Sequence, residues 1–259
     1  MTRNEAAQKA HEHTALMNKL HKDEINHCVA NSIIYNNHSD FSGIEIPKVS
    51  YYDLYVSPED SVSAACRLNR EEGGKTAILN FASYRHPGGQ FLSGSLAQEE
   101  ALCHESILFN VLSEFPGYYN WNNEHKNRSL YMNRALYSPD ILFCPEGEDE
   151  FTCDVITCAA PNLNPYYKYG NCSVTLEENS KILDSRIKFI LKIAADNHVN
   201  NLVLGAWGCG VFMQDPYEVS RLFLKNIEKH RYDITNYTFA IPDAESKNHI
   251  AFVSTFFEK

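Results

Sequence analysis

The chain has 259 residues, of which 44% are hydrophobic and 12% aromatic, and its formal net charge is −10. This length and composition predict one large or two small globular domains, and they exclude a disordered or collagen-like chain. Because the charge is negative and no Lys/Arg cluster appears, we expect no stable nucleic-acid partner. A small phosphorylated ligand is not excluded, since backbone N–H groups can bind an anion without cationic side chains.

The first residues, MTRNEAAQKAHEH, are polar, and no apolar run reaches the roughly 18–20 residues that a membrane span needs. We therefore expect no signal peptide, no membrane partner and a cytoplasmic location. The 8 cysteines are irregularly spaced and include no C-x-x-C pair. We expect them to be reduced, and mostly core residues, rather than disulfides or zinc ligands.

The N-terminal part is rich in Ala, Glu, Gln, Lys and Leu, which predicts a helix over residues 3–36. His13, Met17 and His21 share one face of this helix. No second cysteine or carboxylate stands at ligand spacing, so we expect a solvated helix face and not a zinc site. We expect residues 1–40 to form a helical extension packed on the core.

The remaining residues, 41–259, show no repeat or internal linker and predict a single domain. After a polar break at 36–43, the elements expected in chain order are an extended stretch over 44–56, a helix over 57–72 capped by Ser57 with Pro58 in its first position, a strand over 76–81, a helix over 97–114, a long irregular loop over 115–137, strands over 141–144 and 154–159, a loop over 161–170, a helix over 176–197, a strand over 201–205, a helix over 217–230 and a strand over 237–241. This alternation predicts an α/β three-layer fold with a largely parallel sheet.

Glycine loops follow two of these strands, and in open α/β sheets ligands bind at the carboxyl ends of the strands. After the first loop, Glu99 and Glu100 stand in the first turn of a helix. Two acids there would repel a phosphate, so we expect the phosphate to bind elsewhere on the loops while one carboxylate does acid/base work on a neutral part of the ligand. The plainer interpretation is two acids favoured by a first helical turn.

The first loop resembles the signature of the microbial-type poly(ADP-ribose) glycohydrolases, in which a run of three glycines precedes Q-E-E. Here Gly88, Gly89 and Gln90 precede Gln98, Glu99 and Glu100. Two further segments, 155–163 and 205–212, resemble family sequence, and the second of these resembles its diphosphate-binding loop. The third glycine is replaced by Gln90. If that position needs φ > 0, Gln90 would strain the loop by about 1 kcal/mol or more.

The resemblance implies a macrodomain-like fold with a mixed, largely parallel sheet. It also implies an enzyme that hydrolyses the ribose glycosidic bond of terminal ADP-ribose, with Glu100 as the acid/base and no metal or redox cofactor. Glu99 would fix Glu100 or a ribose hydroxyl. The substrate-binding residues carried over by the resemblance are Asn80, Gly88, Gly89, Gln90, Gln98, Pro161, Asn162, Gly208, Cys209, Gly210, Val211 and Phe212.

Several of these residues have plainer interpretations. Asn80 could cap the turn after its strand, and the glycines of both loops could serve simple turns. Cys209 does not fit a nucleophile elbow, because Trp207 stands where that motif needs glycine. The second loop has no G-K-[ST] either, and Met213 occupies the third glycine position of G-x-G-x-x-G.

Two alternatives to the glycohydrolase are left open. A binding module would recognise ADP-ribose without turnover, and Gln90 is the feature that favours it. A hydrolase could also act on another ribosylated metabolite, or on ADP-ribose attached to a nucleic-acid base or an unusual side chain. The expected partner is ADP-ribose or an ADP-ribosylated protein or nucleic acid. The sequence predicts neither polymer preference nor oligomeric state.

Overall fold

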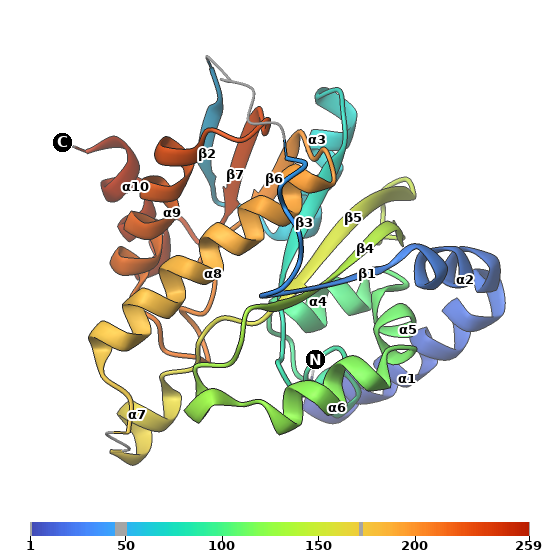
Figure 1. Cartoon of the computed structure of the whole chain (residues 1–259). Helices are drawn as coiled ribbons and strands as arrows, with labels where there is room; N and C mark the ends of the chain where they lie inside the picture. The colour runs from blue at the N-terminus through green and yellow to red at the C-terminus, as the bar shows by residue number, and fades with distance from the viewer. Residues whose placement is uncertain (1, 45–50, 171–172, 259) are drawn as a thin grey trace.

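The computed structural model describes residues 2–44, 51–170 and 173–258, and its centre is a mixed seven-stranded sheet (Figure 1). Across the sheet the strands are β1 (Ile33–Asn36), β4 (Arg134–Phe143), β5 (Phe151–Cys158), β3 (Thr76–Phe81), β6 (Asn201–Leu204), β7 (Asn236–Ala240) and β2 (Asp53–Ser57). The β1–β4 and β4–β5 pairs are antiparallel, and all the other pairs are parallel.

Helices cover both faces of the sheet, which gives the expected three layers (Figure 1). One face carries α1 (Arg3–Leu20), α2 (Lys22–Asn31), α3 (Ser61–Glu71), α4 (Gln98–His104) and α5 (Leu108–Ser113). The other carries α8 (Leu176–Asp196), α9 (Pro216–His230) and α10 (Lys247–Phe257). Strand β3 serves both layers, because Leu79 packs towards α8 and α9 while Ile78 packs towards α3 and α4.

Two short helices and two 3₁₀ turns complete the part of the chain that the structure describes. These are α6 (Pro116–Glu124), α7 (Asn164–Tyr169), η1 (Phe91–Ser93) and η2 (Asn127–Ser129). No helix in the described ranges is both long and apolar enough to cross a membrane. The cysteines described are all free. Five of them are buried, as expected for core residues.

The predicted helix over residues 3–36 is wrong in its second half. It breaks at His21, ends at Asn31, and is followed by strand β1, which pairs with β4. The face that we expected to be solvated instead packs on the core: Met17 is buried, and His13 Nε2 lies 2.9 Å from the Ser106 carbonyl oxygen. The content of alanine and charged residues does not distinguish a helix with a solvated face from a helix that packs on the core through a narrow apolar stripe.

The predicted start of α3 is also wrong. Ser57 ends strand β2, where it pairs with Ala240, and the helix is capped by Asp60, whose carboxylate accepts the N–H groups of Val62 and Ser63. The extended stretch expected over 44–56 is confirmed at residues 53–56, which belong to β2. Residues 45–50 lie outside the described ranges.

The predicted helix over 97–114 is interrupted, because Ser106 bridges to Phe143 of β4 and separates α4 from α5. The predicted loop over 115–137 is wrong in part, because it contains α6 and its last four residues belong to β4, which begins at Arg134 and not at 141 as predicted. The loop over 161–170 contains α7. Strand β3, strand β6, helix α8 and helix α9 lie where the sequence predicts them, to within one residue at each end.

Candidate active site

A cavity of about 580 Å³ opens at the carboxyl ends of four neighbouring strands. Residues that follow directly from β3, β5, β6 and β7 reach it, which is where open α/β sheets bind ligands. Its lining includes Phe81, Leu96, Ala97, Gln98, Ala160, Gly208, Gly210, Val211, Phe212, Ile241, Pro242 and Asp243. The start of α4 and the second glycine loop therefore face one another across a single cavity.

The first glycine loop covers the two carboxylates. Gly88 and Gly89 have φ of +61° and +60°, a region that side chains with a Cβ rarely adopt. A Cβ on Gly89 would lie 2.7 Å from Glu100 Oε1 and 2.9 Å from Glu99 Oε2. Both acids thus converge on the same loop residue, and only a glycine leaves room for them.

Glu99 and Glu100 are 4% and 5% exposed and are held by different donors. Glu100 Oε1 accepts the N–H of Gln90 at 2.8 Å. Glu99 accepts the N–H of Ser83 at 2.6 Å and the side-chain amide of Asn80 at 3.2 Å. The pKa of Glu99 is raised to about 8, first by burial and to a smaller extent by the neighbouring Glu100, against the lowering effect of the Ser83 and Asn80 donors. Two buried acids with a raised pKa at one of them are typical of acid/base sites.

Asn80 and Gln98 lie where β3 meets α4. Asn80 is fully buried, and its Oδ1 has no hydrogen-bond partner in the described part of the chain. Gln98 accepts the N–H of Phe81 at 2.8 Å and donates to the Leu79 carbonyl at 3.0 Å. Gln98 therefore fastens the helix start to the strand end, while Asn80 keeps one acceptor unused beside Glu99.

Gln90 does not strain the loop. Its φ is −110°, which any residue adopts, so the positive φ that we considered for this position is not required. Its backbone N–H binds Glu100, and the residue itself is exposed.

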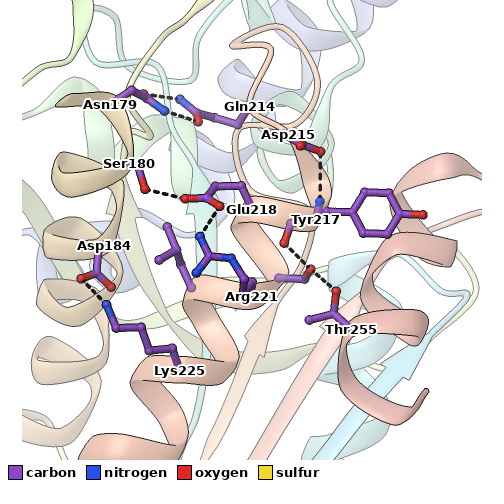
Figure 2. Close-up of polar contacts among 12 residues, drawn as sticks. Asn179, Ser180, Asp184, Gln214, Asp215, Tyr217, Glu218, Arg221, Lys225 and Thr255 are labelled. Carbon is purple, nitrogen blue, oxygen red and sulfur yellow. Dashed lines mark hydrogen bonds and ion pairs between the residues drawn. The ribbon is translucent and has the colours of Figure 1, made fainter. Parts of the chain in front are cut away.

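The second glycine loop is packed tightly against its surroundings. A Cβ on Gly205 would lie 2.7 Å from the Ala240 carbonyl and 2.9 Å from the Phe81 ring, so this loop and the end of β3 are in contact. A Cβ on Gly208 would lie 2.7 Å from Ala160. The loop ends at Gln214, whose buried amide faces Asn179 of α8 (Figure 2).

The side chains of the second loop differ in character. Val211 is 70% exposed at the cavity, whereas Phe212 is half-buried against the Tyr131 ring. Burial raises the pKa of the Cys209 thiol to about 12. A thiol held in its neutral form is a poor nucleophile, in agreement with the absence of a nucleophile elbow.

Pro161 and Asn162 lie beside the cavity and bind the protein itself. The Pro161 carbonyl accepts the amide of Gln214 at 2.7 Å. Asn162 Oδ1 accepts the N–H of Asn164, and its Nδ2 donates to the Tyr131 hydroxyl. Neither residue lines the cavity. Of the other predicted site residues, Gln98, Gly208, Gly210, Val211 and Phe212 line it, whereas Asn80, Gly88, Gly89, Gln90, Glu99, Glu100 and Cys209 do not.

Other cavity residues were missed by the sequence analysis. These are Asp60 at the start of α3, Leu96 before α4, and Pro242, Asp243, Ser246 and Asn248 after β7. The last four follow a predicted strand, so the rule that ligands bind at carboxyl ends could have indicated them. Asp60 was not singled out, because the sequence indicated Ser57 and not Asp60 as the N-cap of this helix.

The chain is similar to solved structures over nearly its whole length. Poly(ADP-ribose) glycohydrolase from Thermomonospora curvata is 27% identical, with a TM-score of 0.86 over 98% of this chain and 100% of that one. The same enzyme bound to the inhibitor ADP-HPD gives 28% and 0.84 with the same coverage. The enzyme from Deinococcus radiodurans in complex with ADP-ribose is 29% identical, with a TM-score of 0.81 over 90% and 97% of the two chains.

A search of curated proteins gives no match. The sequence model of one family, microbial-type PARG, catalytic domain, matches residues 4–145, which is more than half of the chain and includes the first glycine loop and both glutamates. The macrodomain-like fold expected from the resemblance is confirmed by the structural matches. The chain therefore belongs to the microbial-type PARG catalytic domain family and is a hydrolase of the glycosidase class.

Proposed function

We propose that this enzyme binds a terminal ADP-ribose across the two glycine loops and hydrolyses its ribose glycosidic bond with Glu100 as the acid/base. The observation that carries the proposal is the convergence of two buried carboxylates on Gly89, 2.7 and 2.9 Å from the position of its missing Cβ. A sugar held at this loop would lie next to both acids. The similar enzymes from Thermomonospora curvata and Deinococcus radiodurans, solved with ADP-HPD and with ADP-ribose, support the choice of ligand.

The proposed reaction uses one carboxyl group twice. Glu100 gives its proton to the leaving glycosidic oxygen as the bond to the ribose carbon breaks and an oxocarbenium-like centre forms. The resulting carboxylate then takes a proton from the water that attacks this carbon. The products are ADP-ribose and the free acceptor hydroxyl or side chain, and Glu100 ends as it began.

The other residues bind and orient the substrate in this proposal. Asn80 Oδ1, buried without a partner in the described chain, would accept a ribose hydroxyl. Glu99, held by Asn80 and Ser83, would take part in the same contact. Backbone N–H groups of the loop from Gly208 to Phe212 would hold the diphosphate, since consecutive N–H groups bind anions without cationic side chains.

Gln90 no longer counts against turnover on grounds of backbone strain, because its φ is −110°. Its exposed side chain stands beside the loop that holds Glu100, so we propose that it influences which acceptor the enzyme tolerates. The extension at residues 1–40, which we propose as a distinct part of the chain, packs on the same loop: Arg3 Nε donates to the Ser93 carbonyl at 2.9 Å.

Two measurements on the same protein test the proposal against a binding module. Calorimetry with ADP-ribose reports binding, and release of ADP-ribose from the polymer, from proteins mono-ADP-ribosylated on Ser, Arg or Glu, and from ADP-ribosylated DNA reports hydrolysis. We expect binding and release from at least one substrate. Binding with no release from any of them would support the binding module, and release only from an ADP-ribosylated nucleic acid would change the substrate class.

A further inference from the structure

A group of possible metal ligands lies outside the cavity, where the N-terminal helices meet the sheet. His21 stands at the junction of α1 and α2, Cys144 follows β4, and Glu150 precedes β5. One ligand atom from each of these residues lies within 4.8 Å of the other two. Cys144 and Glu150 are more than a hundred positions from His21 in the chain, so no local spacing indicates them as ligands.

The separations suit one small ion. With Zn–S near 2.3 Å and Zn–N near 2.0–2.1 Å, tetrahedral ligands lie about 3.5 Å apart, so the ligand atoms need to approach one another by at most about 1.3 Å from their limit of 4.8 Å. Glu150 is exposed, so its side chain can move freely. Cys144 and His21 are half-buried. Sulfur, imidazole and carboxylate donors together favour Zn²⁺ over Mg²⁺ or Ca²⁺, which prefer oxygen.

The surroundings favour a cation. The turn between β4 and β5 carries Glu146, Glu148 and Asp149 besides Glu150, and Arg70 pairs with only one of these acids, Glu148. Glu24 Oε1 lies 4.0 Å from His21 Nδ1, where a carboxylate can orient a ligating imidazole through its second nitrogen. Cys144 also lines a surface cavity of about 700 Å³, which gives an ion a path to the sulfur.

We propose that His21, Cys144 and Glu150 bind one Zn²⁺, with the remaining position open to water, and that this ion fastens the α1–α2 corner to the β4–β5 turn. On binding, the Cys144 thiol loses its proton to solvent and the thiolate forms the S–Zn bond.

The site would be structural and lie at the end of α1 that is far from the first glycine loop. Helix α1 contacts the first glycine loop through its first turn, near Arg3, while His21 stands at its other end, about 27 Å away for an 18-residue helix. The proposal does not rest on the glycohydrolase assignment, and its test uses the metal alone.

The test is a Zn²⁺ titration by calorimetry on untagged, chelator-treated protein, with Co²⁺ as a spectroscopic probe. We expect one Zn²⁺ per chain, and a thiolate-to-Co²⁺ charge-transfer band with Co²⁺. Cys144→Ser should remove the band, and His21→Ala and Glu150→Gln should each weaken Zn²⁺ binding at least tenfold. The matched controls are Cys66→Ser, His11→Ala and Glu12→Gln, which should bind as the wild type does.

Thermal unfolding gives a second measurement, since an ion that binds only the folded chain raises Tm. We expect Zn²⁺ to raise the Tm of the wild type and of the controls, but not that of Cys144→Ser. Glu150→Gln changes an exposed side chain, so it keeps the test valid if another variant fails to fold. The proposal is overturned if no stoichiometric Zn²⁺ binds, or if the three ligand variants bind it like the wild type.

Discussion

The side-chain amides of Asn179 and Gln214 are hydrogen-bonded to each other in both directions, at 2.9 Å each (Figure 2). Both residues are buried. Gln214 also donates its amide to the Pro161 carbonyl at 2.7 Å and its backbone N–H to the Gly208 carbonyl at 3.0 Å. Asn179 of α8 therefore holds Gln214, and through Gln214 it fixes both the end of the second glycine loop and the segment after β5.

Replacing Asn179 by Ala should loosen this loop. The buried amide of Gln214 would lose its partner in α8, which costs about 1–3 kcal/mol of the free energy of unfolding. We expect a higher KM with a smaller change in kcat, because the loop is proposed to bind the diphosphate and not to do chemistry. Urea unfolding and steady-state kinetics measure the two effects.

The matched control is Lys225→Ala, which removes an ion pair between α8 and α9 (Figure 2). Lys225 pairs with Asp184 at 2.8 Å, but its side chain is 48% exposed, so the change should cost only about 0–1 kcal/mol and leave KM unchanged. Equal effects of the two variants would show that the amide pair is not what holds the loop.

Gly89→Ala should remove most of the activity without unfolding the protein. Its Cβ would press on oxygens of both Glu99 and Glu100, and a misplacement of about 1 Å can cost about 100-fold in rate. We expect kcat/KM to fall by at least that factor. Gly117→Ala is the control, because a Cβ there meets no atom within 4 Å and the residue lies in helix α6, so its kinetics should match the wild type. Unchanged kinetics for Gly89→Ala would contradict the placement of the two acids.

The fold and the site differ in how far the sequence determines them. Strands β3 and β6 are short apolar runs that lead into glycine loops, and helix α8 has a clear apolar stripe, so local pattern places them. The break at Ser106 and the strand at 33–36 depend on pairing with β4, which is distant in the chain, and no local pattern reports that pairing.

The same distinction applies to the binding residues. Glu99, Glu100 and Gly89 are close in sequence and follow a spacing that a motif can record. Asp60 and Asp243 reach the cavity only because β2 and β7 lie side by side in the sheet. The contact between Asn179 and Gln214 likewise depends on how α8 packs, and amide residues are too common for the sequence to single these two out.

Stability should depend on pH through Glu99. Burial raises the pKa of its carboxyl from an ordinary value of 4.5 to about 8 in the folded state. Below pH 4.5 both states are neutral. Between pH 4.5 and 8 the unfolded chain ionises first, so the stabilising contribution is lost as the pH rises. Wild-type Tm should therefore fall relative to that of Glu99→Gln across this range, and the difference should level off above pH 8.

Thermal scans from pH 4 to 9 on both proteins measure this difference. The glutamine variant keeps an acceptor for the Ser83 N–H, so it tests the charge more than the hydrogen bond. A constant difference in Tm across the range would mean that Glu99 ionises in the folded state as it does in water.

Gly94→Ala should separate α1 from the first glycine loop. A Cβ at this position would lie 2.0 Å from the Arg3 carbonyl oxygen and 2.9 Å from the Ala7 nitrogen. Gly147 serves as a control because it also has positive φ (+82°) but an added Cβ meets nothing within 4 Å. Both variants should lose about 1 kcal/mol from backbone strain, and only Gly94→Ala should lose more and show faster hydrogen exchange in α1. Equal losses would mean that the helix does not depend on this contact.

The most direct test of the account is Glu100→Gln, assayed for release of ADP-ribose from the polymer and, by calorimetry, for binding of ADP-ribose. The glutamine keeps an acceptor for the Gln90 N–H but cannot transfer the proton. We predict that release falls by about 10²–10⁴-fold, the usual share of acid/base catalysis, while the affinity for ADP-ribose stays near that of the wild type. Release at the wild-type rate from this variant would contradict the assignment of Glu100 as the acid/base.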